Sequence, residues 1–272
     1  MPYSCFLVAP LLRSLQLLAL FLAVFGVSPL IQAAQPLSGT QWQQAYSDQH
    51  ETLLKRLNGR TPAGFKAGLT SGVAQQKFNS DRAVYGVLLA GSQQASGNPV
   101  QISHFGRGMI ELEVAFRLKR RVTEAIADIA TLKSVVAEIA PAFELPDLAL
   151  LTQPSDGVLG IVRANVAAHS FVVGDAVALN ELLGKPVADI DDMAVKLYSN
   201  GDLVLVASSG DMHGGQWQNL MHLINDRIAH GWVIEPEQWL LTGAIGKMLP
   251  LDTGRYEAKI DGLGELAINV LP

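Results

Sequence analysis

The spacing of hydrophobic residues predicts three helices along the chain. Between residues 41 and 57, apolar positions recur every three or four residues among polar ones. A second helix is expected over 124–139, with Thr123 as its N-cap and Pro141 just beyond its end. A third helix is expected over 217–231, where a glycine ends the apolar pattern.

Alternating and continuous apolar runs predict the strands. Residues 109–118 (MIELEVAFRL) alternate between apolar and polar side chains, as a half-buried strand does. Turn-forming residues at 200–202 and at 261–264 each predict a hairpin between the runs that flank them. The expected strands cover residues 84–89, 109–118, 142–145, 165–177, 193–199, 203–208, 239–241, 255–260 and 265–271.

The order of these elements indicates the fold class. Strands outnumber helices and do not alternate with them, so a doubly wound parallel sheet is disfavoured. We predict an α+β protein with a mixed or antiparallel sheet at its core. A hydrophobic content of 49% over 272 residues is enough to bury such a core in one domain.

The first 34 residues have the layout of a secretory signal peptide. Arg13 precedes the apolar run 15–27, and the small residues Ala33 and Ala34 mark a cleavage site. The run is shorter than the roughly 20 residues of a membrane span. We expect a signal peptide at 1–34, a single domain at 35–272, and a periplasmic or secreted protein. An uncleaved anchor, or a start codon placed too far upstream, is the alternative.

Charge and cysteine content narrow the function. The net charge is −5, and the short basic run 119–121 is best explained as a solvated strand end, so no nucleic-acid partner is expected. No membrane partner is expected after the signal is removed. The single cysteine, Cys5, lies in the signal segment, which excludes disulfides, thiolate nucleophiles and cysteine-bound zinc from the mature chain.

Three acidic residues are candidate metal ligands. Glu111 and Glu113 lie two apart on a predicted strand, so their side chains point to the same face. Two neighbouring carboxylates repel each other, and a hard divalent ion such as Mg²⁺ would satisfy both. Glu144, in the apolar setting PAFELP, is the natural third ligand. The alternatives are a solvated face of an edge strand for the pair and a capping or surface role for Glu144.

Lys66 is the candidate catalytic residue. It lies in the glycine-rich segment 64–72 (GFKAGLTSG), where the backbone must turn sharply or lie close to another group. A lysine near a bound cation has a lowered pKa, which suits proton transfer. A lysine in a surface loop is the alternative.

These segments occur in an order that resembles a known family. The series is GFKAGLT at 64–70, IELEVA at 110–115, PAFE at 141–144, LTGAIG at 241–246 and YEAKIDGLG at 256–264. It resembles the 2-keto-4-pentenoate hydratase and 4-oxalocrotonate decarboxylase group of the fumarylacetoacetate hydrolase superfamily, over about residues 42–270.

The resemblance implies a fold and a site. The fold would be a rolled mixed β-sandwich with a few flanking helices, usually in homo-oligomers. The site would hold Mg²⁺ or Mn²⁺ on Glu111, Glu113 and Glu144, with Lys66 as the active-site lysine. It also implies that Leu69 and Thr242 bind the substrate.

The resemblance further implies a metal-dependent hydratase or lyase that acts on small 2-oxo acids by stabilising their enolate. A decarboxylase, an acylpyruvate-type carbon–carbon hydrolase and a non-catalytic periplasmic binder of oxo acids are the alternatives. Three positions depart from the family pattern, because Val84, Ala164 and Ala167 replace polar residues that order substrate or water. These changes bear on hydration more than on metal binding.

Overall fold

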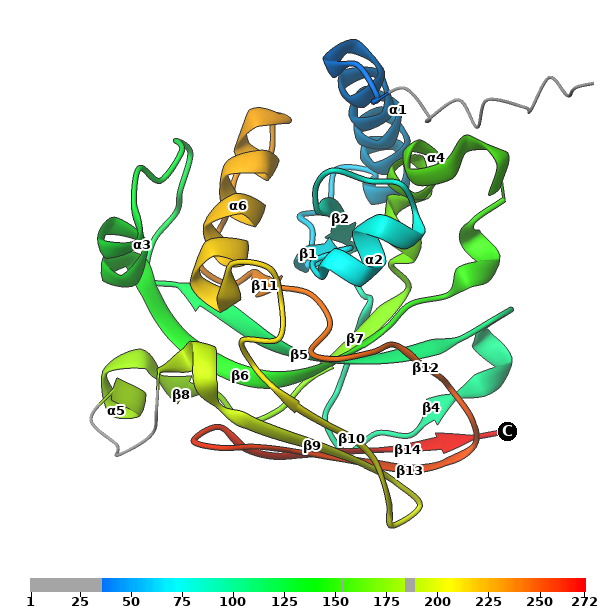
Figure 1. The fold of residues 1–272 in the computed structure, drawn as a ribbon, viewed down its shortest axis with the longest axis vertical. Coiled ribbons are helices and arrows are strands. Elements are labelled where there is room, and N and C mark those ends of the chain that lie inside the picture. The colour runs from blue at the N-terminus through cyan, green and yellow to red at the C-terminus, as the bar shows by residue number, and fades with distance from the viewer. Residues whose placement is uncertain (1–35, 153, 184–188) are drawn as a thin grey trace, which may run out of the picture. The chain divides into compact units, whose positions relative to one another are not determined.

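Two β-sheets form the framework of the protein in this computed structural model, which describes residues 36–152, 154–183 and 189–272. The larger sheet has the strand order β2-β1-β11-β5-β6-β7-β3, with β12 added beside β5 and β8 beside β6. The smaller sheet has the order β10-β9-β13-β14-β4. In Figure 1, α1 and α6 lie on one side of the larger sheet and the smaller sheet lies on the other. The expected signal peptide falls outside the described residues.

The larger sheet is mixed and the smaller one mostly antiparallel. β1 runs parallel to β11, and β3 runs parallel to β7, while the central pair β5 and β6 is antiparallel. The strands of the larger sheet are β1 Gly64–Gly68, β2 Val84–Leu88, β3 Gln93–Gln94, β5 Met109–Leu118, β6 Val136–Leu145, β7 Ser170–Val173, β8 Val177–Ala178, β11 Trp239–Leu241 and β12 Leu249–Pro250. The smaller sheet consists of β4 Val100–Gln101, β9 Ala194–Ser199, β10 Asp202–Ser208, β13 Gly254–Ile260 and β14 Gly264–Leu271.

Two long helices pack on the larger sheet. The first, α1, begins at a capping box in which Ser38 and Gln41 satisfy each other's backbone amides, and it buries Trp42 and Leu53. The other, α6, buries Trp217 and Leu220. The α-helices are α1 Gly39–Leu57, α2 Gly72–Lys77, α3 Ile129–Val135, α4 Gly157–Arg163, α5 Leu179–Leu183 and α6 Gly215–Ala229. No helix of the described residues is both long enough and apolar enough to cross a membrane.

Most predicted elements are present. The helices predicted at 41–57 and 217–231, the strand at 109–118 and both hairpins correspond to α1, α6, β5, β9–β10 and β13–β14. Residues 37–272 form one compact unit.

The helix predicted over 124–139 is wrong. Asp128, not Thr123, caps a helix that ends at Val135, and the chain then continues as the ten-residue strand β6. Pairing with β5 on one side, and with β8 at Glu138 and Ile139 on the other, outweighs the helical preference of residues 136–140. Pro141 lies within this strand and does not stop a helix; its carbonyl accepts a hydrogen bond from the Gly174 amide.

The single strand predicted over 165–177 is also wrong. Residues 165–167 form a tight left-handed turn, and β7 and β8 are separate short strands. Asn165 explains the difference, because its side chain forms two hydrogen bonds with the backbone of Val87 on β2. The turn is thus tied to a neighbouring strand and cannot extend.

Candidate metal and catalytic site

Lys66 lies at the centre of β1, between β2 and β11. It is opposite Gly86 on β2 and opposite Leu241 on β11. The side chain is only 2% exposed, so the surface-loop alternative is wrong. Gly64 lies close to the neighbouring strand β11, because a Cβ there would lie 1.9 Å from the backbone oxygen of Trp239. The first five residues of the glycine-rich segment therefore form a buried strand that places a lysine in the interior.

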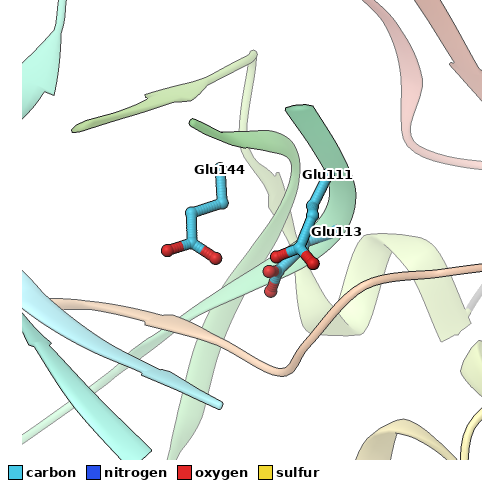
Figure 2. A group of neighbouring side chains, drawn as sticks. All are labelled: Glu111, Glu113 and Glu144. Atoms are coloured by element: carbon cyan, nitrogen blue, oxygen red, sulfur yellow. The ribbon is translucent and has the colours of Figure 1, made fainter. Parts of the chain in front are cut away.

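The three candidate ligands come from the two central strands. Glu111 on β5 lies directly opposite Glu144 on β6, and Glu113 lies opposite Ala142. Residues opposite each other in antiparallel strands point to the same face, so all three carboxyl groups lie together (Figure 2). One oxygen from each lies within 4.8 Å of the others. Glu113 and Glu144 are fully buried and Glu111 is partly exposed, so the solvated-face alternative is wrong.

Two of these carboxyl groups are each held by one oxygen. The Lys66 ammonium lies 2.8 Å from Glu144 Oε2, and the backbone amide of Gly243 donates to Glu113 Oε2 over 2.6 Å. The second oxygen of each group, Oε1, is buried and has no hydrogen-bond partner among the described residues. The fold thus orients both carboxyl groups and leaves one oxygen of each without a partner.

The pKa values of the trio reflect this crowding. Burial raises the pKa of Glu111 to about 8, with Lys66 opposing and Glu144 reinforcing the effect. Burial and the neighbouring Glu111 raise the pKa of Glu113 to about 8. Burial raises the pKa of Glu144 to about 7 although Lys66 counteracts it. Without a cation, the three carboxyl groups therefore favour their neutral, protonated forms. A bound cation would favour their ionised forms.

The pKa of Lys66 is shifted in the opposite direction to the one expected beside a metal ion. Burial lowers it, but the negative charges of Glu144, Glu111 and Glu113 together outweigh burial and raise it. A divalent ion on the three carboxylates would cancel that attraction and leave burial and charge repulsion to act on the ammonium.

The donor set fits a hard divalent cation. All three groups offer carboxylate oxygens, which Mg²⁺ prefers, and two unpartnered oxygens point into a cluster already crowded with negative charge. An unpartnered buried carboxylate oxygen is costly unless a cation or donor completes it. Glu111, Glu113 and Glu144 are therefore the residues that would hold the ion.

The two predicted substrate-binding residues, Leu69 and Thr242, have different surroundings. Leu69 follows the end of β1 with a left-handed backbone (φ 54°), and its carbonyl accepts a hydrogen bond from Gln75. Thr242 is fully buried, and its hydroxyl contacts the carbonyl of Val114 and the side chain of Gln216. The Thr242 hydroxyl is thus engaged within the protein, and the residue next to it, Gly243, is the one that contacts a candidate ligand.

Comparison with known proteins identifies relatives with shared sequence and fold. No family model matches the chain. A 2-keto-4-pentenoate hydratase of Burkholderia vietnamiensis is 29% identical over 216 residues, which cover 78% of this chain and 79% of that protein. A 4-oxalocrotonate decarboxylase of a Pseudomonas species is 21% identical over 212 residues, with 78% and 79% covered. The chain is a homologue of the 2-keto-4-pentenoate hydratases. The resemblance predicted from the motif series is confirmed.

Solved structures share the fold of this hydratase homologue. The 4-oxalocrotonate decarboxylase from Pseudomonas putida G7, complexed with magnesium and adipate, aligns with a TM-score of 0.73 at 21% identity, covering 84% of this chain and 85% of that one. The fumarylpyruvate hydrolase from Pseudomonas aeruginosa, in complex with Mn²⁺ and pyruvate, aligns with a TM-score of 0.59 at 14% identity, covering 76% and 88%. The predicted α+β fold of the fumarylacetoacetate hydrolase type is confirmed.

The three departures from the hydratase pattern lie near Lys66 or on the turn that contacts it. Val84 is buried on β2, and its side chain and the Lys66 ammonium would each lie 3.7 Å from a Cβ placed on Gly68. Ala164 precedes the left-handed turn and Ala167 is its last residue; within this turn the Val166 carbonyl accepts a hydrogen bond from Lys66 over 3.3 Å. In this hydratase homologue, Ala167 therefore lies on the turn that Lys66 contacts.

Sequence reasoning missed two residues that shape this site. Asn165 was not identified as a site residue, yet it fixes the turn that contacts Lys66. Gln216 was not singled out at all. Gln216 is an uncharged polar residue in the first turn of a helix. Polar residues are common at this position, so the sequence does not distinguish Gln216 from other helix-start residues.

Proposed function

We propose that the protein is a divalent-metal-dependent hydratase or lyase acting on small 2-oxo (enol) acids such as 2-keto-4-pentenoate. The observation that carries the proposal is the buried trio of Glu111, Glu113 and Glu144 with Lys66 2.8 Å from Glu144. The hydratase homologues, which align over more than three quarters of the chain, support it.

The residues would divide the work as follows. Glu111, Glu113 and Glu144 hold the ion, with Mg²⁺ or Mn²⁺ as the proposed cofactor. The ion, when bound, supplies a Lewis acid that stabilises negative charge on the oxygen of a 2-oxo group. Lys66 carries a proton to or from a substrate carbon, since its ammonium faces the carboxyl cluster and, among the described residues, has only Glu144 and the Val166 carbonyl as partners. Leu69 and Thr242 are proposed to border the substrate.

Two observations favour other functions. Replacement of polar family residues by Ala164 and Ala167 favours a binder of small oxo acids that does not turn them over. The shared fold with a fumarylpyruvate hydrolase favours an acylpyruvate-type carbon–carbon hydrolase. Decarboxylation also proceeds through an enolate, so it remains an alternative reaction at the same site.

An ultraviolet assay tests the proposal. The purified protein is mixed with 2-hydroxypenta-2,4-dienoate and Mg²⁺, and loss of the dienol absorbance is followed beside Glu113→Ala, Lys66→Ala and the exposed control Glu51→Gln. Metal-dependent loss in the wild type and control, absent in both site variants, supports the hydratase reaction. Mg²⁺-dependent oxalate binding without turnover of this compound, 4-oxalocrotonate or an acylpyruvate would leave the binder as the function.

We also propose that residues 1–34 direct export to the periplasm or medium and that the mature chain forms a homo-oligomer. The charge and apolar pattern of residues 13–34 supports export. N-terminal sequencing of the protein recovered from a bacterial periplasm tests this proposal, because a mature N-terminus near residue 35 is expected. An intact N-terminus in the cytoplasmic fraction would reject it.

Light scattering of the mature protein gives its oligomeric state.

A further inference from the structure

We infer that Gln216, at the start of α6, is a positioning residue for the candidate metal ligand Glu113, acting through Thr242 and the Gly243 amide. The inference rests on the proposed function in one respect, that Glu113 binds a divalent ion. It gives Thr242 a positioning role in addition to its proposed place beside the substrate, because the Thr242 hydroxyl contacts Gln216 on α6.

The Gln216 side chain has a fixed orientation. It is fully buried, and its Nε2 donates to the carbonyl of Ser209 over 2.6 Å. With the amide nitrogen committed, Oε1 faces the Thr242 hydroxyl at 2.5 Å and can only accept. The Thr242 hydroxyl therefore supplies the proton in this contact.

The backbone around Gln216 is held as well. Its amide donates to Asp191 Oδ1 over 2.5 Å, so an aspartate from a preceding loop caps the first turn of α6. Gly214 and Gly215 both have left-handed backbones, and a Cβ at Gly215 would lie 2.7 Å from the Asp191 carboxyl group. The contacts of the first turn of α6 thus hold Gln216 in place, so that its side chain can position the segment that contains Thr242.

Thr242 transmits this position to the carboxyl cluster. Its hydroxyl lies 3.1 Å from the Val114 carbonyl, and its amide donates to the same carbonyl over 3.3 Å. The next amide, that of Gly243, donates to Glu113 Oε2 over 2.6 Å. Because Glu113 precedes Val114 on β5, the Thr242–Gly243 segment contacts two successive residues of that strand: Thr242 contacts Val114, and Gly243 contacts Glu113.

The Gly243 backbone has little freedom to compensate if Thr242 moves. Its φ of 106° is accessible mainly to glycine, and a Cβ there would lie 2.5 Å from Thr70 Oγ1. The amide is therefore aimed at Glu113 by Thr242 on one side and by packing against Thr70 on the other. Holding Oε2 in this way leaves Oε1 of Glu113 available to an ion.

Mn²⁺ affinity, measured by electron paramagnetic resonance of the free ion, tests the inference without relying on turnover. Partners that orient metal ligands contribute about 10–100-fold to metal affinity. Thr242→Val, which keeps the shape but lacks the hydroxyl, and Gln216→Met are each expected to weaken Mn²⁺ binding by that factor. Thr242→Ser, which restores the hydroxyl, is expected to bind within about threefold of the wild type.

The matched control is Asn225→Leu. Asn225 lies on the same helix and forms two hydrogen bonds with the backbone of Ile126, away from the carboxyl cluster. Its loss is expected to lower thermal stability without changing Mn²⁺ affinity. The double variant Gln216→Met with Thr242→Val should bind Mn²⁺ about as strongly as the single variant that binds it less strongly. The two losses should not add, because both substitutions remove the same contact between Gln216 and Thr242.

The outcomes separate this inference from the proposed function. Wild-type affinity in Thr242→Val, or an equal loss in Asn225→Leu and Thr242→Ser, overturns the positioning role. If Gln216→Met does not fold, the Thr242 pair decides alone. A wild-type protein that binds no Mn²⁺ at all contradicts the proposed metal site itself.

Discussion

Glu111 and Glu144 lie directly opposite each other on adjacent antiparallel strands, so two carboxyl groups share one face of the sheet. Like charges in this position destabilise a sheet by up to about 1 kcal/mol. Unless the groups are protonated or bind a cation, the fold is less stable with both present. This cost at the centre of the largest sheet marks a site shaped for binding.

Glu111→Gln should therefore stabilise the metal-free protein and abolish its response to metal. At pH 8.5, chemical unfolding in chelator is expected to show a gain of about 0.5–1 kcal/mol, because one of two facing charges is removed. The wild type should gain about 2.7 kcal/mol in Mg²⁺ at 100 times its Kd, and the variant should gain almost nothing. A variant that keeps the full Mg²⁺ response would show that Glu111 is not a ligand; Glu51→Gln is the exposed control.

The stability of the metal-free protein should fall between about pH 5 and pH 8. The carboxyl trio has folded pKa values of about 7 to 8, above the ordinary value of 4.5, so the folded state holds more protons in this window. The stabilising contribution is complete below pH 4.5 and is lost as pH rises through the folded pKa values. Saturating Mg²⁺ should remove this loss, because the bound form is ionised throughout.

The measurement for this pH dependence is the free energy of unfolding in chelator, compared with that of Glu111→Gln at each pH. His50 and His169 have pKa values lowered by burial, so their contribution runs in the opposite direction: it is present above pH 6.5 and is lost as pH falls below 6.5 toward their lowered folded pKa values. It is the same in both proteins and cancels in the difference. A difference that does not change with pH would contradict the raised pKa of Glu111.

Lys66→Met should separate catalysis from metal binding. Loss of a general acid or base typically lowers kcat by about 10²–10⁴-fold. Removing the ammonium 2.8 Å from Glu144 also removes a positive charge beside the ion, so Mn²⁺ affinity should be retained or increased. Stopped turnover with unchanged or tighter Mn²⁺ binding is the expected pair of results. Turnover equal to that of the exposed control Lys55→Met would exclude Lys66 from the reaction.

Gly64→Ala should break the pairing that delivers Lys66. The added Cβ would lie 1.9 Å from the Trp239 carbonyl oxygen, which is backbone and cannot move without separating β1 from β11. We expect a loss of about 3 kcal/mol or more, at the upper end of the range for overpacking. Gly72→Ala, where a Cβ meets nothing within 4 Å, should change stability by less than about 0.5 kcal/mol. Thermal melting compares the two, and equal stability would contradict the close approach.

Local pattern was sufficient wherever an element's own residues decide its structure. β5 was predicted with the correct ends because alternation of apolar and polar residues over 109–118 has only one solution in a half-buried strand. The same alternation placed Glu111 and Glu113 on one face. Both hairpins were also predicted, because turns such as that at Asn200 and Gly201 require left-handed backbones that few residues adopt.

Prediction from the local sequence pattern failed where contacts with residues distant in sequence determine the secondary structure. Residues 136–140 favour a helix, but they lie between β5 and β8 and become a strand. The turn at 165–167 holds Val166 at φ 54°, a strained value for a β-branched residue, because Asn165 is bound to Val87, 78 residues away. No short-range signal encodes either partner.

The sequence by itself determined the kinds of groups available to the site: three glutamates, a lysine in a glycine-rich segment, and a single cysteine, at position 5. Tertiary structure decided how these groups act. It paired Glu144 with Glu111 across β5 and β6, buried Lys66 beside them, and placed Gln216 against Thr242. Residue type fixes which atoms can bind a cation or carry a proton, but burial and the distance between charges set pKa and affinity, and only the folded chain fixes those.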